Sequence, residues 1–502
     1  MTKPNKTENF HLMCKLQKQY ENWKLKAVTY NKKICVLSKR IKELIKSRDK
    51  WRAKYYDKKS AYNKLKKQYA QVEGFPFEKV VNHSYPLEII LFAIWLRSSS
   101  SISLEGVRKV LEVFNCVFDF SYEIPCKETI RNWEKKHSFH RLESIKEDVD
   151  GEWAVIIDES ITIGEEKILL VLGIPLSIYE YEDALKFTDI KVLQISISKT
   201  WKSVEVSSVL NDLLSIGYDV KYVVSDGCKT LKCAIASSDL ERVPDCTHAF
   251  GNILKSEYEK VEEYQSFDKD CNLLKKQTNL GANAVISPPK YRAKGKFLNL
   301  WEKAKWSNSM LKIMELSSSQ RNKILSNSMQ DRLAFITNYK SLIQRLFLQC
   351  NIINNLHKVL KGKGLSEETV RICRKILKNK YKKEMKVIRS DFRLNTDSFW
   401  QKIETYFKEG LVLLKKLNLS KIICTSDIIE SMFGKYKERV RKGSLSVTDD
   451  CLNMANFTEG FSRVETKKAM EEVKIVDIIK WRKENCKDSL RAKKQKLYKN
   501  MG

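Results

Sequence analysis

The feature of this sequence that most restricts its fold is a run of apolar and amphipathic segments between residues 151 and 255. Three apolar segments come first, WAVIIDES, KILLVLGIPL and KVLQISISKT. The helical segment SVEVSSVLNDLLSIGY follows, and the apolar KYVVSDG then leads into a helix that starts at Lys229. Apolar runs of this length are typical of strands buried on both faces. The order predicts three strands, a helix, a strand and a helix, and then a short strand and a further helix in CTHAFGNILKSEYEKV.

Two of the predicted strands end on an aspartate, Asp158 and Asp226, and Gly227 would let the chain turn after the second. An ionised carboxylate beside a core is costly unless it has a partner. Each aspartate alone would more often be a turn residue, but this strand order, which is that of the RNase H-like fold, would place the two side by side. Mg²⁺ prefers oxygen ligands, and phosphoryl transfer uses two divalent ions about 3.5–4 Å apart. The pair therefore predicts a site for two Mg²⁺ or Mn²⁺ ions.

A third carboxylate is expected from the helical segment TSDIIESMFGKYKERVRKG. Six residues separate Glu430 from Lys437, which places both on one face of the helix. Glu430 could then hold metal while Lys437 contacts a DNA phosphate. The apolar residues of the segment also fit an ordinary amphipathic helix, and Glu159 and Asp427 are neighbouring alternatives for the ligands.

The first 75 residues carry a heptad pattern. Positions that alternate by four and three residues from Leu16 to Val72 are mostly apolar or aromatic. Of these seam positions, only Arg48 and Lys58 are charged. A seam of this length predicts a coiled-coil helix, which Gly74 would end. We expect it to make the protein a homodimer or a higher oligomer; the alternative is a solvated helix that packs on its own chain.

Residues 80–145 are predicted to form a compact helical module. Three helical segments follow Pro86, Ser103 and Pro125. The last two suit a helix-turn-helix whose second helix enters the major groove of DNA, although their connection is longer than the usual turn; a plain three-helix bundle is the alternative. The predicted DNA-binding side chains of this helix are Lys127, Arg131, Asn132, Lys135 and Lys136.

The charge balance points to a polyanionic partner. The 502 residues include 93 Lys and Arg against 62 Asp and Glu, a formal net charge of +31. DNA is favoured, because each phosphate contact releases a condensed counterion. The longest apolar run is too short to span a bilayer, so we expect no membrane partner. The 13 scattered cysteines, without a C-x-x-C pair, favour a reduced intracellular compartment.

Two further groups of residues could have a functional role, but an ordinary structural role is favoured for each. Cys228, Cys233, Cys246 and His248 could be assembled into a zinc site, but their irregular spacing favours buried hydrophobic roles. The tryptophans of the basic helical stretch after residue 296 could stack on an unpaired base, but core packing is favoured for each of them; they are Trp301, Trp306 and Trp400.

At this point the sequence resembles a family. Strand-end Asp158 and Asp226, helical Glu430 and then Lys437 look like the DDE transposases of bacterial insertion sequences. The resemblance implies that the three acids are the catalytic metal ligands and that Lys437 contacts transposon-end DNA. It also implies a location in the cytoplasm of a bacterium, on its nucleoid. The stretch Asp245-Cys246-Thr247-His248 is similar to the Cys/His stretch after the second Asp in hAT-like transposases, which implies an active-site or structural role for His248. The helical block between Asp226 and Glu430 resembles the insertion domain of such enzymes.

We therefore predict an α+β multidomain transposase that cleaves and joins transposon-end DNA, with terminal inverted repeats and target DNA as partners. A catalytically inactive or domesticated DNA-binding protein and an RNase H-like junction nuclease are the alternatives. The predicted domains are a coiled coil (1–75), a helical DNA-binding module (80–145), the first part of an RNase H-like core (150–265), an all-α insertion (266–418), the last helices of the core (419–460) and a basic C-terminal tail (461–502).

Overall fold

The computed structural model describes most of the chain. The described residues are 6–69, 78–100, 102–118, 123–160, 162–178, 184–278, 282–290, 297, 300–388, 396–440, 446–458, 460–486, 494–495 and 498. Side chains are described from 13 to 59 in the first of these ranges, and 380–388 and 396–397 are described by their backbone alone. The contacts divide the chain into two compact units, residues 1–77 with 117–120, and residues 78–116 with 121–502.

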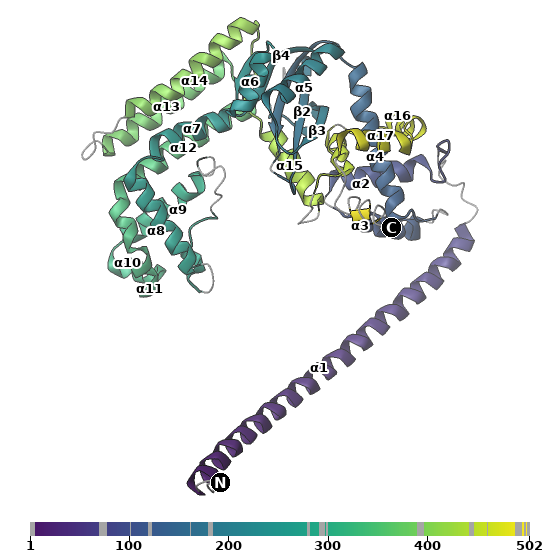
Figure 1. Cartoon of the computed structure of the whole chain (residues 1–502), viewed down its shortest axis with the longest axis vertical. Coiled ribbons are helices and arrows are strands. Elements are labelled where there is room, and N and C mark those ends of the chain that lie inside the picture. The colour runs from purple at the N-terminus through teal and green to yellow at the C-terminus, as the bar shows by residue number, and fades with distance from the viewer. Residues whose placement is uncertain are drawn as a thin grey trace. The chain divides into compact units, whose positions relative to one another are not determined.

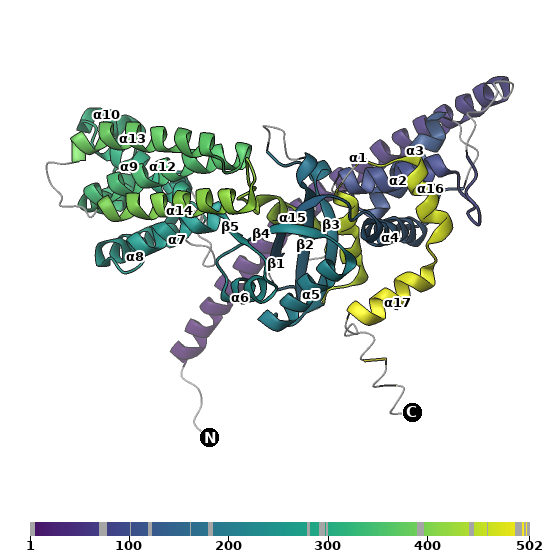
Figure 2. The ribbon, with the colours of Figure 1, turned by 90° about the horizontal axis from the view of Figure 1, so that it is seen from above.

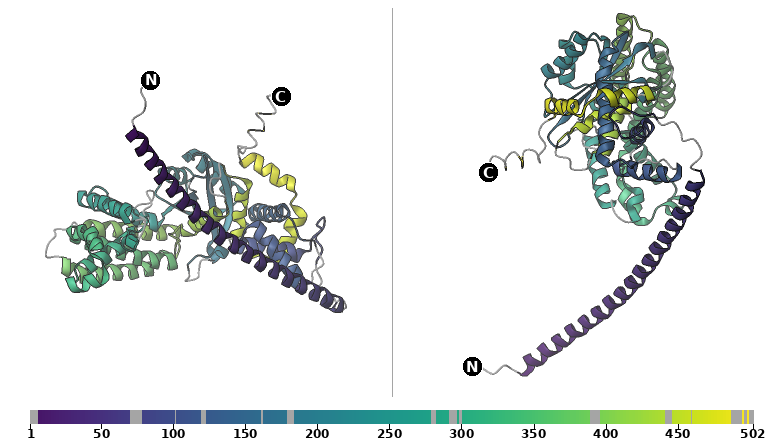
Figure 3. Two further views of the ribbon diagram at one scale, coloured as in Figure 1. Left: turned by 90° about the horizontal axis from the view of Figure 1, so that it is seen from below. Right: turned by 90° about the vertical axis from the view of Figure 1, so that its right-hand side faces the viewer.

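The first unit consists mainly of one helix, α1 (Lys6–Tyr69), which is uninterrupted (Figure 3). Its described side chains are all exposed, including those of the predicted seam. Leu37, Ile41 and Leu44 are each more than half exposed. The heptad prediction of a long helix is confirmed, and dimerisation through the seam stays a prediction.

A mixed five-stranded sheet forms the centre of the second unit (Figure 1). Its strand order is β3-β2-β1-β4-β5 (Figure 2). β1 pairs antiparallel with β2 and parallel with β4, while β2–β3 is antiparallel and β4–β5 parallel. The strands are β1 (Glu152–Glu159), β2 (Lys167–Pro175), β3 (Lys191–Ser198), β4 (Asp219–Ser225) and β5 (Arg242–Pro244). The predicted order of strands and helices is thus observed, but the short fifth strand lies before CTHAFGNILKSEYEKV, whose first 13 residues are all helix α7 (Cys246–Tyr258).

Alternate residues of β1 face two different hydrophobic cores. Val155 and Ile157 pack in a cluster with side chains of α5 (Ser203–Ile216) and α6 (Lys229–Ser237). Ala154 and Ile156 point to the opposite face, where their cluster includes side chains of α7 and of α15 (Asp427–Arg439). This alternation, which follows from the two-residue repeat of a strand, decides the face on which each strand-end side chain lies.

Three helices at the start of this unit form a separate small core. They are α2 (Leu87–Ser99), α3 (Leu104–Phe118) and α4 (Lys127–Ser144). Ile90, Val107 and Trp133 are buried together there with Ala469 of α16 (Arg463–Glu472). The segment expected as a basic tail from residue 461 thus contains packed helices as far as Asn485, because α16 packs on the helical module and α17 (Ile475–Asn485) buries Ile478 and Trp481.

The long block between the strands and α15 is helical, as predicted. Its cluster of buried residues is continuous with the core on the α7 face of the sheet, and α12 and α14 both pack beside α7 (Figure 2). The helices are α8 (Glu262–Thr278), α9 (Leu300–Met314), α10 (Ser318–Ile324), α11 (Asn327–Leu333), α12 (Lys340–Lys363), α13 (Glu367–Ile388) and α14 (Thr396–Leu417). Short 3₁₀ segments lie at Ile145–Glu147, Leu176–Ile178, Phe187–Asp189, Ala282–Ile286, Ala334–Tyr339 and Asp449–Phe457.

Candidate active site

The two strand-end aspartates lie at equivalent places on neighbouring strands. β1 and β4 are parallel, and Ile156 pairs with Val224 at the end of their ladder. Asp158 and Asp226 each follow two residues later, so both belong to the side-chain phase that faces α7 and α15. The sequence predicted neighbouring aspartates on the condition that their two strands are adjacent, and β1 and β4 are adjacent.

The electrostatics show that Asp158 is close to other carboxylates. Burial, together with the negative charges of Asp226 and Glu430, raises the pKa of Asp158 to about 7. The Glu159 backbone N–H donates to Asp158 Oδ1 at 2.8 Å and opposes this rise. A buried carboxylate beside like charges favours protonation unless a cation is near.

Asp226 is fixed by the backbone that follows it and by an arginine. The Cys228 backbone N–H donates to Asp226 Oδ1 at 2.9 Å. Arg242 of β5 donates to the Asp226 carbonyl at 2.6 Å and to Ser225 Oγ at 2.9 Å. Gly227 does not have a positive φ; instead, a Cβ there would lie 3.3 Å from Asn252 Nδ2 of α7. The glycine therefore permits close approach of α7 rather than an unusual turn.

Glu430 reaches the same place from α15 and meets a histidine. His248 Nε2 lies 3.6 Å from Glu430 Oε1. This contact, with the negative charges of Asp245 and Asp226, outweighs partial burial and raises the pKa of His248 to about 9. The imidazole is thus a cation among the carboxylates at neutral pH.

Asp245 holds the two helices that carry Glu430 and His248, and the sequence analysis missed this role. It caps α7, since Asp245 Oδ1 accepts from the His248 backbone N–H at 2.7 Å. Its other oxygen accepts from the Ser426 backbone N–H at 2.6 Å and from Ser426 Oγ at 2.9 Å, directly before α15. An aspartate three residues before the histidine is a recognisable N-cap signal, but its bonds to Ser426 depend on the fold.

Asp427, the alternative to Glu430, is engaged elsewhere. Its carboxylate lies 2.8 Å from Lys361 Nζ and 3.5 Å from His357 Nε2, both on α12, and accepts from Thr247 at 3.2 Å. Burial would raise the pKa of Asp427, but the contacts with His357 and Lys361 outweigh burial and hold that pKa below its usual value. Glu159, the other alternative, pairs with Lys167 at 2.7 Å.

The residues at this place suit divalent cations chemically, although they do not form a closed ligand set. Asp158 and Asp226 supply the hard oxygen donors that Mg²⁺ and Mn²⁺ accept. Burial first, and the charge of Asp226 second, raise the pKa of Asp158, and a nearby cation would oppose both effects. Within the described part of the chain, no three His, Cys, Asp or Glu side chains are placed to hold one metal ion. Glu430 is in contact with His248 and completes no such group.

Lys437 lies on α15 two turns after Glu430, as the spacing predicted. Its ammonium is 5.7 Å from the centre of the Phe433 ring. The neighbouring Lys435 lies 4.2 Å from the centre of the Phe187 ring, outside α15. The last two turns of this helix therefore present cations that are partly covered by aromatic rings.

The five predicted DNA-binding side chains of α4 have different surroundings. Asn132 is exposed, and Lys127 and Arg131 reach solvent while pairing with Glu105 and Glu128. Two others face inward: Lys135 is buried against Asp449 at 2.9 Å, and Lys136 donates to the Met470 carbonyl at 3.0 Å. The internal contacts of Lys135 and Lys136 argue against a direct role in DNA binding.

Among the residues considered for zinc, Cys246 alone is a buried cysteine, whereas the three tryptophans all pack against the core. Cys233 is exposed, and no three of the four residues considered for zinc, all of which the structure describes, are placed to hold one metal ion. Trp301 is half-buried and stacks on Phe347, with ring centres 5.5 Å apart. Trp306 and Trp400 also pack against the core.

Comparison with known proteins assigns no family. No protein-family model and no curated protein match the chain. Among solved structures, the chain is similar to a Drosophila P element transposase strand transfer complex, at 12% identity and a TM-score of 0.38, over 83% of this chain and 98% of that one. The bacterial origin expected from the sequence stays a prediction. Among the described residues, no helix is long and apolar enough to cross a membrane.

Proposed function

We propose that this chain is a DNA transposase with an RNase H-like core, which cleaves transposon ends and joins them to target DNA. The observation that carries the proposal is the placement of Asp158 and Asp226 at the ends of adjacent parallel strands, with Glu430 delivered by α15 to the same face. The sheet order β3-β2-β1-β4-β5, with α5 between β3 and β4 along the chain, supports the hypothesis of an RNase H-like core.

The chain's own residues would bind and orient DNA around this place. Two Mg²⁺ or Mn²⁺ ions held by Asp158, Asp226 and Glu430 would activate the attacking oxygen and stabilise the leaving oxygen. Lys437 would contact a phosphate next to the scissile bond, since it lies on the Glu430 face of α15. His248, a cation near neutral pH, would pair with a DNA phosphate when Glu430 turns to the ions.

End recognition and assembly are assigned to the other parts of the chain. Lys127, Arg131 and Asn132 at the start of α4 would contact terminal-repeat DNA. The exposed seam of α1 would bring two copies together, because in a coiled coil a second helix covers the apolar side chains at the heptad positions. The net charge of +31 supports a polyanionic partner.

A strand-transfer assay tests the proposal. Labelled DNA carrying the inverted repeats that flank the gene is incubated with the protein, Mg²⁺ and a target plasmid. The proposal predicts free transposon ends and label joined to the plasmid, and loss of both products when EDTA removes the metal. Binding of repeat DNA without either product, in Mg²⁺ and in Mn²⁺, would contradict it.

One observation favours a second candidate, a DNA-binding protein without catalysis. Glu430 lies against His248, a contact that competes with metal binding. Under that hypothesis the three carboxylates and His248 would form a purely structural cluster. Divalent ions would then leave the melting temperature of the protein unchanged, whereas ligand binding to the folded state raises it.

A further inference from the structure

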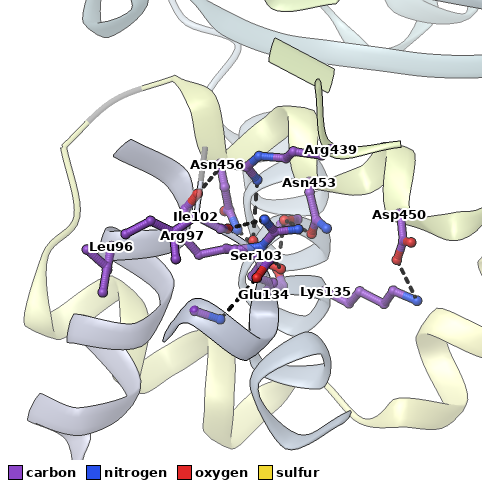
Figure 4. A network of polar contacts seen from close by, with 12 residues as sticks. Leu96, Arg97, Ile102, Ser103, Glu134, Lys135, Arg439, Asp450, Asn453 and Asn456 are labelled. Carbon is purple, nitrogen blue, oxygen red and sulfur yellow. Dashed lines mark hydrogen bonds and ion pairs between the residues drawn. The ribbon is translucent and has the colours of Figure 1, made fainter. Parts of the chain in front are cut away.

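The far end of α15 is joined to the helical module by a buried charged group. Glu134 of α4 is 1% exposed and lies between two arginines. Arg439, the last residue of α15, reaches Glu134 Oε1 at 3.3 Å, and Arg97 of α2 reaches Glu134 Oε2 at 3.3 Å. Arg439 also donates to the Arg97 carbonyl (Figure 4). We name Arg97, Glu134 and Arg439 the α4–α15 joint.

The three side chains of the α4–α15 joint are largely removed from solvent, unlike those of an ordinary surface ion pair. Burial raises the pKa of Glu134 and lowers the pKa of Arg439 to about 10. The Arg439 guanidinium also lies 4.4 Å from the centre of the Phe457 ring, and Arg97 donates to the Ile102 carbonyl at 2.5 Å. Removing one partner of such a group leaves a buried charge uncompensated, which is strongly destabilising.

The joint also borders the surface assigned to DNA. Glu134 and Arg439 line a cavity of about 660 Å³, and Lys127 and Arg131 line the same cavity from the first turns of α4. Glu134 lies one turn after Arg131 on the same helix. Displacement of the start of α4 by DNA would therefore act on Arg439 through one side chain.

The opposite end of α15 is held by different elements. Asp427 in its first turn contacts Lys361 and His357 of α12, and Ser426 contacts Asp245 of α7. Glu430 is the only one of the three proposed acids on this helix, while Asp158 and Asp226 are carried by the sheet. The position of Glu430 relative to Asp158 and Asp226 therefore depends on how α15 is held at its two ends.

We propose that Glu134 is a positioning residue that fixes α15 through Arg439 and thereby couples the helical module to the placement of Glu430. The inference rests on the proposed function for its catalytic consequence, and on the contacts alone for its structural one. Each consequence has its own measurement, so that the failure of one is distinguishable from the failure of the other.

Hydrogen–deuterium exchange tests the structural consequence. Glu134→Gln should speed amide exchange in the last turns of α15, because a neutral amide holds Arg439 less strongly. The matched control is Glu465→Gln, which weakens the pairing of Glu465 with Arg141 at the other end of α4, at 2.5 Å, without touching α15. Unchanged α15 exchange in Glu134→Gln, or the same increase in Glu465→Gln, would overturn the proposal.

Cleavage and binding of end DNA test the catalytic consequence in the full chain. Glu134→Gln should lower the cleavage rate at saturating DNA by about 10- to 100-fold, the scale of a small misplacement of a reacting group, with little change in DNA affinity. Equal loss of rate in Glu465→Gln would overturn the coupling. If the unaltered chain does not cleave, the proposed function fails while the exchange result still decides the joint.

A second variant keeps the test decisive if Glu134→Gln does not fold. Arg439→Lys retains a cation but lacks the planar fork that bonds Glu134 and the Arg97 carbonyl together. It should also speed exchange in α15 and slow cleavage. Normal exchange and normal cleavage in Arg439→Lys would show that the joint does not position the helix.

Discussion

Two carboxylates one turn apart on α15 illustrate how surroundings assign roles at the scale of single residues. Asp427 is held by a lysine, a histidine and a threonine, and the first two keep its pKa low. Glu430 is exposed on the face that looks toward Asp158 and Asp226, and contacts His248. These surroundings are why we propose metal binding for Glu430 and a helix-holding role for Asp427.

The two carboxylates should respond differently to neutral replacement. Glu430→Gln should lower metal-dependent cleavage by about 10²–10³-fold or more, the scale of losing one group that stabilises developing charge, with the melting temperature kept. Asp427→Asn should lower the free energy of unfolding by about 1–3 kcal/mol and retain most of the cleavage rate. Cleavage assays and thermal melts of both variants check this; the reverse pattern would make Asp427 the third ligand.

At the scale of elements, α1 and the start of α4 each carry exposed side chains for which we propose a binding partner. The apolar seam of α1 is exposed along its described length, and the start of α4 carries Lys127, Arg131 and Asn132 at or near the surface. The first surface suits a second helix and the second suits DNA. Both assignments are open to direct substitution.

Charges placed in the seam of α1 should separate the subunits. Replacing Leu37, Ile41 and Leu44 with Asp puts like charges where two helices would meet, so the mass from light scattering should fall to that of one chain. The control replaces Lys39, Lys42 and Lys46 with Asp, which adds the same residues outside the seam. An unchanged mass in the seam variant would contradict dimerisation by α1.

The start of α4 should carry sequence discrimination. Arg131→Ala and Asn132→Ala should each cost about 1–3 kcal/mol of preference for terminal-repeat over random DNA, the scale of one base-edge contact. Lys109→Ala, at an exposed site on α3, removes a similar charge and should leave the preference unchanged. Competition binding with the two DNAs measures this. Equal losses on both DNAs would mark these residues as backbone contacts.

Much of the sheet and the site followed from local sequence, whereas the connections between distant segments did not. Apolar strands that end at Asp158 and Asp226 predicted both the strand order and the paired carboxylates. The contact of Glu134 with Arg439 joins residues 305 positions apart, and no local pattern reveals it. The inward contact of Lys135 with Asp449 and the packing of α16 are likewise hidden from local sequence, because a lysine-rich helix has the same pattern whether it is solvated or packed.

At the scale of the whole molecule, the positive charge should dominate DNA affinity. A net charge of +31 favours many phosphate contacts, so affinity should fall steeply as salt rises. Lys437→Ala should weaken binding of end DNA and reduce the slope of log affinity against log salt by roughly 0.9, the value for one phosphate. Binding isotherms over a salt series check this. An unchanged slope would remove Lys437 from the DNA contacts.

The most direct measurement is cleavage of labelled transposon-end DNA by Asp158→Asn and Asp226→Asn, with DNA binding measured on the same preparations. Each change keeps side-chain size and removes one metal-binding charge from the paired strand ends. The account predicts that both variants lose Mg²⁺- and Mn²⁺-dependent cleavage and strand transfer, while end binding is retained or tightened because a carboxylate facing phosphate is gone. Full activity in both variants would contradict the proposal that the active site lies where β1 and β4 end.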